Sequence, residues 1–360
     1  MKMTPAEIEE RFVDIPRKRL VYTPTPFNKL ENMSNDYGVD IYMKREDLSG
    51  PSTFGGNKTR KLEFILGKAL EERVDYLITY GAYQSNACMQ MTTFCNSCDI
   101  KPILFLGDTK NKGIPENLTG NLLLSNILGA EIHYVSKPET EDPTDLNPLW
   151  IKVMDQANKK KEELEKQGYR VELVPVGCTH EYGWVAYTLL FTELLAQTKA
   201  SGFEMDYIFH TNGSGGSLPA MIAANLMTDS KVKIVSVNVR SWEEGNLITK
   251  KTCLDRVKYV FDRLNVPCPS DEEIYAEMNI DENYIKPGYG IPNPDVQKSI
   301  KEVARREGMF VDPTYSGRGF HGMMEYIRKG IVPEGSKVVF IHTGGSGSFF
   351  SNPDLVKDLY

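Results

Sequence analysis

Short apolar runs alternate with longer helix-like segments along most of this chain. The runs at residues 75–82 (DYLITYGA) and 101–108 (KPILFLGD) have the pattern of buried strands, and residues 205–227 pass from a strand pattern through a glycine loop into a helix pattern. This alternation predicts an α/β architecture with parallel sheets. Ligands of such sheets bind at the carboxyl ends of the strands. The candidate loops are those around Gly81, Gly177, Gly213 and Gly344.

The length and charge of the chain narrow the class of protein. Its 360 residues suffice for two domains, and the net charge of -7 argues against nucleic acid or an anionic membrane as a partner. No window approaches the roughly 18 consecutive apolar residues of a membrane span, and the acidic N-terminus lacks a secretion-signal pattern. Six cysteines without an export signal indicate reduced thiols and a cytoplasmic protein. Cys95 and Cys98 form a C-x-x-C motif, but no second pair follows at zinc-site spacing, so we expect no metal.

The loop TNGSGGS, residues 211–217, is a candidate phosphate site. It follows a strand pattern and opens a helix pattern, so backbone N–H groups and the helix N-terminus would converge on one anion. It lacks the Lys-Ser/Thr ending of a Walker loop and the spacing of a dinucleotide fingerprint. We therefore expect a phosphate smaller than a nucleotide, and the alternative is a tight turn without a ligand.

Lys58 lies in a second glycine-containing stretch, FGGNKTRKLEFIL. The preceding residues are polar and turn-forming rather than a strand, so this stretch is not a Walker loop. A helix is expected to begin near Thr59, which places Lys58 beside Arg60, Lys61 and the positive end of the helix. Those charges would lower the pKa of the Lys58 ammonium and make a nucleophilic amine available. The alternative is an ordinary solvated lysine.

A reactive lysine together with a separate small-phosphate loop is the minimal requirement for pyridoxal 5'-phosphate. The amine binds one end of the cofactor ring as a Schiff base, and the loop holds the phosphate at the other end.

Seven motifs in order strengthen this interpretation: KREDLSGPSTFGGNKTRKLEFIL, GAYQSNACMQ, NLLLSNILGAEI, NGSGGS, PGYGIPN, VDPTYSGRGFHGM and IHTGGSG. From about Pro24 to Gly347 the chain resembles the fold-type-II pyridoxal-phosphate enzymes of the 1-aminocyclopropane-1-carboxylate deaminase and D-cysteine desulfhydrase family. The resemblance implies a fold like the tryptophan synthase β subunit, with two open twisted α/β domains and the cofactor in the cleft. We expect a large domain at 1–67 and 169–360, a small inserted domain at 68–168, and a homodimer.

The resemblance also implies roles for individual residues. The catalytic residues would be Lys58, Ser85, Tyr289 and Tyr315. The cofactor would be held by Lys58, Lys61, Asn86, Gly213, Ser214, Gly215, Gly216, Ser217, Ser316 and Thr343. A small amino-acid substrate would lie against Gln84, Ser85, Asn86, Thr179 and His180. Without the resemblance, the QSN stretch is a helix cap, each tyrosine a packing residue, and His180 a cap or surface residue.

Ser316 and Thr343 separate the two branches of this family. In the family that the chain resembles, the residue after the second tyrosine faces the pyridine nitrogen of the cofactor. The deaminases of that family have glutamate at this position, and leucine at the position of Thr343. A hydroxyl does not keep the ring nitrogen protonated as a carboxylate does, and such a ring suits β-elimination. We therefore expect a lyase that converts D-cysteine to pyruvate, hydrogen sulfide and ammonia.

Three alternatives stay open. The first is deamination of 1-aminocyclopropane-1-carboxylate to 2-oxobutanoate. The second is a pyridoxal-phosphate-binding protein without turnover, because residues 87–90 and the loop 178–184 depart from the family pattern. The third, a nucleotide-binding protein, rests on the glycine loop alone.

Overall fold

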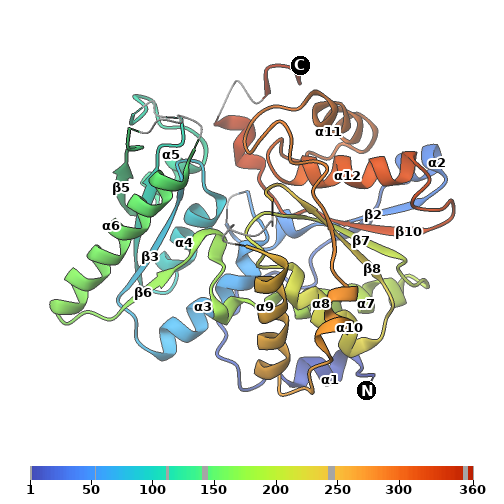
Figure 1. The fold of residues 1–360 in the computed structure, drawn as a ribbon, viewed down its shortest axis with the longest axis horizontal. Coiled ribbons are helices and arrows are strands. Elements are labelled where there is room, and N and C mark those ends of the chain that lie inside the picture. The colour runs from blue at the N-terminus through green and yellow to red at the C-terminus, as the bar shows by residue number, and fades with distance from the viewer. Residues whose placement is uncertain are drawn as a thin grey trace.

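The computed structural model describes residues 2–52, 54–110, 113–139, 145–241, 248–351 and 356–359. Its larger sheet has six strands in the order β1-β2-β10-β7-β8-β9 (Figure 1). The strands are β1 (Phe27–Lys29), β2 (Asp40–Lys44), β10 (Lys337–Ile341), β7 (Tyr207–Asn212), β8 (Lys233–Asn238) and β9 (Asn279–Asp281). Only the pairing of β1 with β2 is antiparallel. The predicted α/β architecture with parallel strands is confirmed.

The smaller sheet has four parallel strands in the order β5-β4-β3-β6. They are β5 (Glu131–Val135), β4 (Lys101–Gly107), β3 (Tyr76–Ala82) and β6 (Val171–Val174). The two runs predicted as buried strands are β3 and β4, and they pair directly, with Tyr76 opposite Lys101. The domain limits expected from the sequence stay a prediction; β6, which completes this sheet, lies just beyond residue 168.

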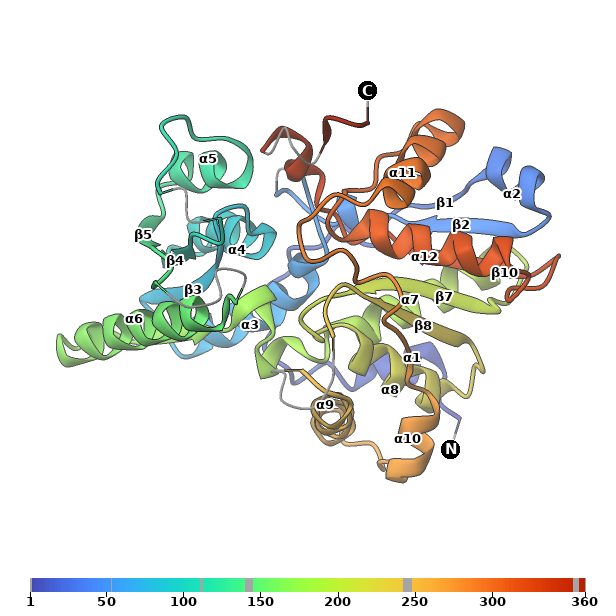
Figure 2. The same cartoon turned by 45° about the horizontal axis from the view of Figure 1, so that its top comes forward.

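Helices cover both faces of the larger sheet (Figure 2). One face packs against α1 (Pro5–Glu10), α7 (Ala186–Ala200), α8 (Leu218–Thr228), α9 (Lys250–Arg263) and α10 (Asp271–Ala276). The other packs against α2 (Glu31–Tyr37), α11 (Pro294–Glu307) and α12 (Ser316–Arg328). Neighbouring strand residues enter opposite cores: Ile208 lies in the first and Phe209 in the second. This follows from the two-residue period of a strand.

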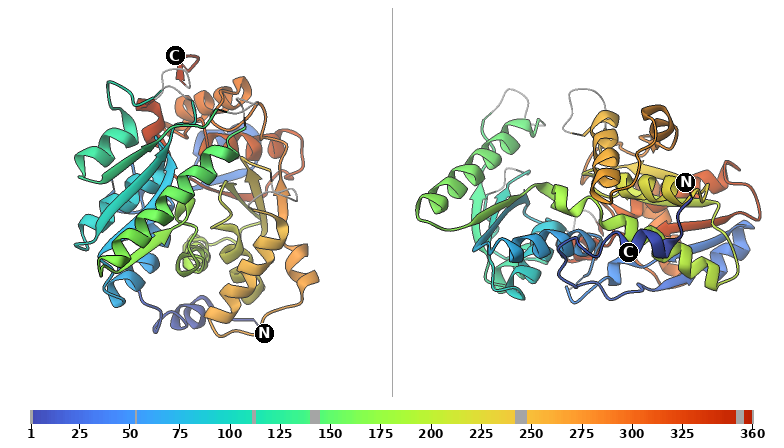
Figure 3. Two further views of the ribbon diagram at one scale, coloured as in Figure 1. Left: turned by 60° about the vertical axis from the view of Figure 1, so that its left-hand side comes forward. Right: turned by 90° about the horizontal axis from the view of Figure 1, so that it is seen from below.

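The smaller sheet is also covered on both faces, and the two sheets with their helices form two lobes (Figure 3). One face packs against α3 (Lys58–Glu71), α4 (Asn86–Asn96) and α5 (Gly120–Ile127), and the other against α6 (Asn147–Lys166). Short 3-10 turns are η1 (Glu46–Leu48), η2 (Val176–Cys178), η3 (Glu181–Gly183) and η4 (Ser346–Phe350). Among the described residues, no helix is long and apolar enough to cross a membrane.

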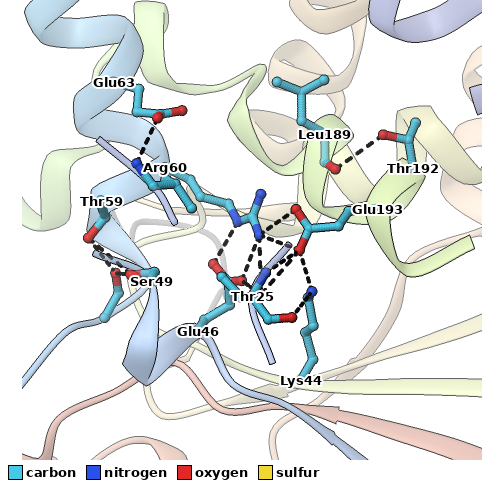
Figure 4. Close-up of polar contacts among 12 residues, drawn as sticks. Thr25, Lys44, Glu46, Ser49, Thr59, Arg60, Glu63, Leu189, Thr192 and Glu193 are labelled. Carbon is cyan, nitrogen blue, oxygen red and sulfur yellow. Dashed lines mark hydrogen bonds and ion pairs between the residues drawn. The ribbon is translucent and has the colours of Figure 1, made fainter. Parts of the chain in front are cut away.

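A buried charge network holds the first turn of α3 in place (Figure 4). The Arg60 guanidinium donates to both carboxylate oxygens of Glu46, at 2.7 and 2.8 Å, and to Glu193 at 3.1 Å. Lys44 pairs with the same Glu193. Burial opposes the charge of Arg60, but the two carboxylates hold its pKa above the ordinary value. Two cations and two anions therefore balance, as buried charges require.

Candidate active site

Two glycine-containing loops meet where α3 begins. The backbone N–H of Asn57 donates to the Thr343 carbonyl at 3.1 Å. A Cβ added to Gly344 would lie 2.8 Å from the Cα of Gly56, so only glycine allows the loops to come this close. Thr343 follows β10, which is the direct neighbour of β7. The loops after β7 and β10 and the first residue of α3 are thus brought to one edge of the larger sheet.

Lys58 is the first residue of α3. Its Nζ lies 5.8 Å from the centre of the Tyr315 ring. Its pKa is lowered chiefly by burial, while Cys178 and Asp312 act in the opposite direction. The predicted direction of the shift is confirmed, but the predicted cause is wrong: neither Arg60, which is turned into the buried network, nor Lys61 is among the causes, and burial is the largest. Burial thus favours the neutral amine, which is the form of a lysine that acts as a nucleophile and base.

Tyr289 and Tyr315 lie together in front of Lys58. Their hydroxyl groups are in hydrogen-bond contact, and their rings meet edge to face with centroids 5.6 Å apart. Burial first, and Tyr289 second, raise the pKa of Tyr315 well above its ordinary value. Tyr315 therefore stays protonated at neutral pH and can donate a proton rather than accept one. The guanidinium of Arg240, which the sequence did not single out, lies 4.4 Å from the Tyr289 ring centre.

A buried carboxylate fixes the turn that carries Tyr315. Asp312 accepts hydrogen bonds from the N–H groups of Thr314, Tyr315 and Ser316 at 2.7–2.9 Å. The Ser316 hydroxyl also donates to Asp312 at 2.7 Å, and both side chains are fully buried. The sequence analysis missed Asp312. An Asp-Pro pair before a helix is a turn signal that points to such a role.

The loop Gly213–Ser217, here called the cup, connects β7 to α8, and its role in binding a phosphate stays a prediction. The Asn212 side chain accepts from the Gly215 N–H at 3.0 Å. The N–H groups of Ser214, Gly216 and Ser217 make no hydrogen bond within the described part of the chain. Together with the N-terminus of α8 they offer donors to an anion.

Lys61 supplies a cation beside this cup. It is fully buried, and its Nζ has one long hydrogen bond, 3.3 Å to the Gly177 carbonyl. A Cβ added to Gly216 would lie 2.8 Å from this Nζ, so the amine faces the loop directly. Burial, and next the charge of Lys58, lower the pKa of Lys61 to about 7. A buried amine with a single long hydrogen bond fits the phosphate group of pyridoxal phosphate, which would supply it with hydrogen-bond acceptors and a negative charge.

Thr179 and His180, both predicted to contact substrate, differ in position. The Thr179 hydroxyl donates to the Ser214 hydroxyl at 2.9 Å and so forms part of the cup wall. His180 caps η3: its Nδ1 accepts from the Tyr182 N–H at 3.4 Å, and its Nε2 lies 3.3 Å from Glu172. Both ring nitrogens of His180 thus have partners, Tyr182 in η3 and Glu172 on β6, and the first contact agrees with its alternative role as a cap. Its contact with substrate stays a prediction.

Gln84, Ser85 and Asn86 lie at the carboxyl end of β3, in the smaller sheet. Ser85 caps α4 by accepting from the Cys88 N–H at 3.2 Å. Gln84 bonds to the start of α5 through both ends of its amide, and Asn86 accepts from the Asn121 amide at 2.8 Å. No hydrogen bond between described residues joins these three side chains to Lys58. Their roles toward cofactor and substrate stay predictions.

The C-x-x-C motif carries no metal-site geometry. Cys95 is buried near the end of α4, and the Cys98 N–H donates to its carbonyl at 2.9 Å. The described residues contain no group of three or more histidine, cysteine or acidic side chains placed to hold a metal ion.

Comparisons with known proteins agree with this chemistry. A family model described as "Pyridoxal-phosphate dependent enzyme" matches residues 18–344. The 1-aminocyclopropane-1-carboxylate deaminase of Burkholderia multivorans is 30% identical over 92% of this chain and 94% of its own. The enzyme of that name from Pseudomonas syringae pv. syringae is 29% identical over 95% and 98%.

Solved structures support the fold as well. The crystal structure of a protein described as an ACC deaminase homologue has a TM-score of 0.84 and 30% identity, and covers 99% of this chain and 100% of its own. A hydrogen sulfide-producing enzyme from Fusobacterium nucleatum has a TM-score of 0.60 at 17% identity, over 91% and 96%. At that identity the second likeness concerns the fold alone.

Proposed function

Because the chain belongs to the pyridoxal-phosphate dependent enzyme family and its relatives include 1-aminocyclopropane-1-carboxylate deaminases, we propose that it removes the amino group of a small amino acid as ammonia and leaves a 2-oxo acid. The observation that carries this proposal is the placement of Lys58. A lysine amine with a lowered pKa faces a protonated Tyr315 beside an anion cup with its own buried cation.

The chain divides the work among its own residues. Bound pyridoxal phosphate supplies a carbonyl that condenses with amines and a ring that withdraws electrons. Lys58, whose pKa is lowered by burial, accepts a proton in its neutral form, and Tyr315 donates one. Lys61 and the free N–H groups of the cup bind the phosphate and so orient the cofactor relative to both side chains.

1-Aminocyclopropane-1-carboxylate is the first candidate substrate. Its deamination consumes one water and yields 2-oxobutanoate and ammonia. Relatives of this name match over nearly the whole chain, and no comparison favours the desulfhydrase branch that Ser316 and Thr343 led us to expect. The argument from Ser316 also overlooked Asp312. A carboxylate lies one hydrogen bond behind the Ser316 hydroxyl, so negative charge is not missing from this position.

D-Cysteine is the second candidate, and one observation favours it. The side chain at 316 is a hydroxyl, and a ring without a direct carboxylate partner suits β-elimination. Elimination from D-cysteine, followed by addition of one water, yields pyruvate, hydrogen sulfide and ammonia.

A substrate panel tests the proposal. Purified protein loaded with cofactor is incubated with 1-aminocyclopropane-1-carboxylate, D-cysteine or L-cysteine, and ammonia, 2-oxobutanoate, pyruvate and sulfide are measured, with Lys58→Ala as the control. We expect ammonia and 2-oxobutanoate from the cyclopropane substrate; pyruvate and sulfide from D-cysteine alone would favour the second candidate. No ammonia from any of the three would contradict both. The homodimer that the resemblance implies is tested on the same sample by light scattering.

A further inference from the structure

We propose that Arg256, in the middle of α9, is a cofactor-positioning residue that holds the phosphate loop in its binding conformation from behind. Its Nη1 donates to the carbonyl oxygens of Ser214 and Gly215, at 3.1 and 2.9 Å. Both acceptors belong to the cup, yet α9 begins more than thirty residues further along the chain. No sequence motif marks the contact.

The direction of these hydrogen bonds fixes the direction of the cup's donors. In a planar trans peptide the C=O and the following N–H point to opposite sides. Because the Gly215 carbonyl faces Arg256, the N–H of Gly216 points away from it. That N–H has no partner among the described residues, whereas the Gly215 N–H is already taken by Asn212. Arg256 therefore holds one free donor of the cup toward the anion.

Arg256 also adds charge at the cup. It is one of the cations whose repulsion contributes to the lowered pKa of Lys61, after burial and Lys58. The two side chains approach the loop from different elements, Lys61 from α3 and Arg256 from α9. A bound phosphate dianion would relieve this repulsion, since it would lie close to both cations.

An aromatic contact orients the guanidinium. Its carbon lies 5.1 Å from the ring centre of Trp184, and Trp184 meets Tyr259 edge to face with centroids 5.1 Å apart. A guanidinium stacked in this way loses little further entropy when it bonds the two carbonyls. Trp184 directly follows η3, so the same stack ties the loop that carries Thr179 to the back of the cup.

The proposal concerns the phosphate of the cofactor and rests on the family assignment, not on which amino acid is deaminated. Its test therefore compares pyridoxal phosphate with pyridoxal, which lacks the phosphate. Dissociation constants of both are measured by absorbance in the wild type and in Arg256→Gln and Arg256→Lys. Arg263→Gln is the matched control, since it removes an exposed cation two turns further along the same helix.

For Arg256→Gln we expect pyridoxal phosphate to bind about tenfold more weakly or worse, the usual cost of losing a charged hydrogen bond, with pyridoxal nearly unchanged. Arg256→Lys should recover part of the loss, because it restores the charge but not the paired donors, and Arg263→Gln should match the wild type. The proposal would be overturned if Arg256→Gln and Arg256→Lys each weakened the binding of pyridoxal phosphate and of pyridoxal by the same factor. It would also be overturned if neither variant weakened the binding of pyridoxal phosphate. A loss of turnover with unchanged cofactor affinity would overturn it as well, while leaving the proposed function intact.

Discussion

The Nζ atom of Lys58 lies 5.8 Å from the centre of the Tyr315 ring. Lys58 is the first residue of α3, and Tyr315 directly precedes α12. The two residues are 257 positions apart in sequence. The loop before Lys58 touches the loop after β10 at Gly56 and Gly344, and the hydroxyl of Ser316, the neighbour of Tyr315, donates to the Gly344 carbonyl at 3.1 Å. An amine whose pKa is lowered by burial therefore lies close to a protonated phenol at one edge of the larger sheet.

Tyr315→Phe should lower kcat about a hundredfold or more with little change in cofactor binding, because general-acid catalysis contributes on that order. The ring stays, so packing against Lys58 is retained. Tyr42→Phe is the control, since it removes the hydroxyl of a partly buried tyrosine on β2 whose ring stacks on Phe27 and Phe203. Steady-state kinetics on the substrate found in the panel checks this, and a Tyr315→Phe enzyme with full kcat would rule out Tyr315 as the proton donor.

Phosphate binding should depend on pH through Lys61. Its pKa of about 7 means that the protonated, anion-binding form is lost as pH rises above 7. In cofactor-free protein, calorimetry should show inorganic phosphate binding more weakly between pH 7 and 9. Lys61→Met should bind weakly and without this slope, whereas Lys68→Met, which changes a partly exposed lysine on the same helix, should behave as the wild type. A pH-independent affinity in the wild type would contradict the assignment.

His210 should make the fold sensitive to acid. It is fully buried on β7, neither ring nitrogen has a hydrogen-bond partner among the described residues, and burial lowers its pKa to about 4. Between pH 6.5 and 4, His210 is protonated in the unfolded chain but stays neutral in the native state. The free energy of unfolding is therefore unaffected by this group above pH 6.5 and falls with decreasing pH below it, by roughly 3 kcal/mol in total.

His210→Phe should remove this part of the acid dependence. Urea unfolding between pH 4 and 7 measures it, with His133→Phe, at a more exposed position, as the control. The same slope of unfolding free energy against pH in wild type and His210→Phe would show that His210 is not responsible.

Asp312→Asn should destabilise the turn that carries Tyr315. An amide offers one acceptor oxygen where the carboxylate has two, so N–H groups of Thr314, Tyr315 or Ser316 lose their partner. We expect a loss of about 2 kcal/mol in unfolding free energy, the usual cost of a buried unsatisfied donor. Ser316→Ala keeps the three N–H bonds to the carboxylate but removes the hydroxyl that donates to Asp312 and accepts from the Asp312 N–H at 2.8 Å, so it should also destabilise this turn. Denaturant unfolding compares the two, and an unchanged midpoint for Asp312→Asn would contradict the role of Asp312.

The sequence predicted the local features of the fold and site well. Strands β3 and β4 were expected because their residues are apolar on both faces, as buried parallel strands are. The position of Lys58 at the start of α3 was expected from the polar turn before it. Both rest on neighbours within a few residues.

Contacts across the chain were not predictable in the same way. Arg60 was taken as a neighbour of Lys58, but Glu46 and Glu193, the latter far along the sequence, draw its guanidinium to the other side. Arg256 was missed because its partners, Ser214 and Gly215, are set by how α9 packs against their loop. Asp312 was missed although its partners lie within four residues and the Asp-Pro pair is a local turn signal. The preference for D-cysteine rested on Ser316 and Thr343. It did not take into account the Asp312 carboxylate, which accepts a hydrogen bond from the Ser316 hydroxyl.

The most direct test of the account is to locate the amine that holds the cofactor. Protein loaded with pyridoxal phosphate is reduced with sodium borohydride, digested, and mapped by mass spectrometry. We expect the phosphopyridoxyl group on Lys58, and loss of the visible absorbance in Lys58→Ala but not in Lys61→Met at saturating cofactor. A modification on Lys61, or on any lysine other than Lys58, would contradict the central claim.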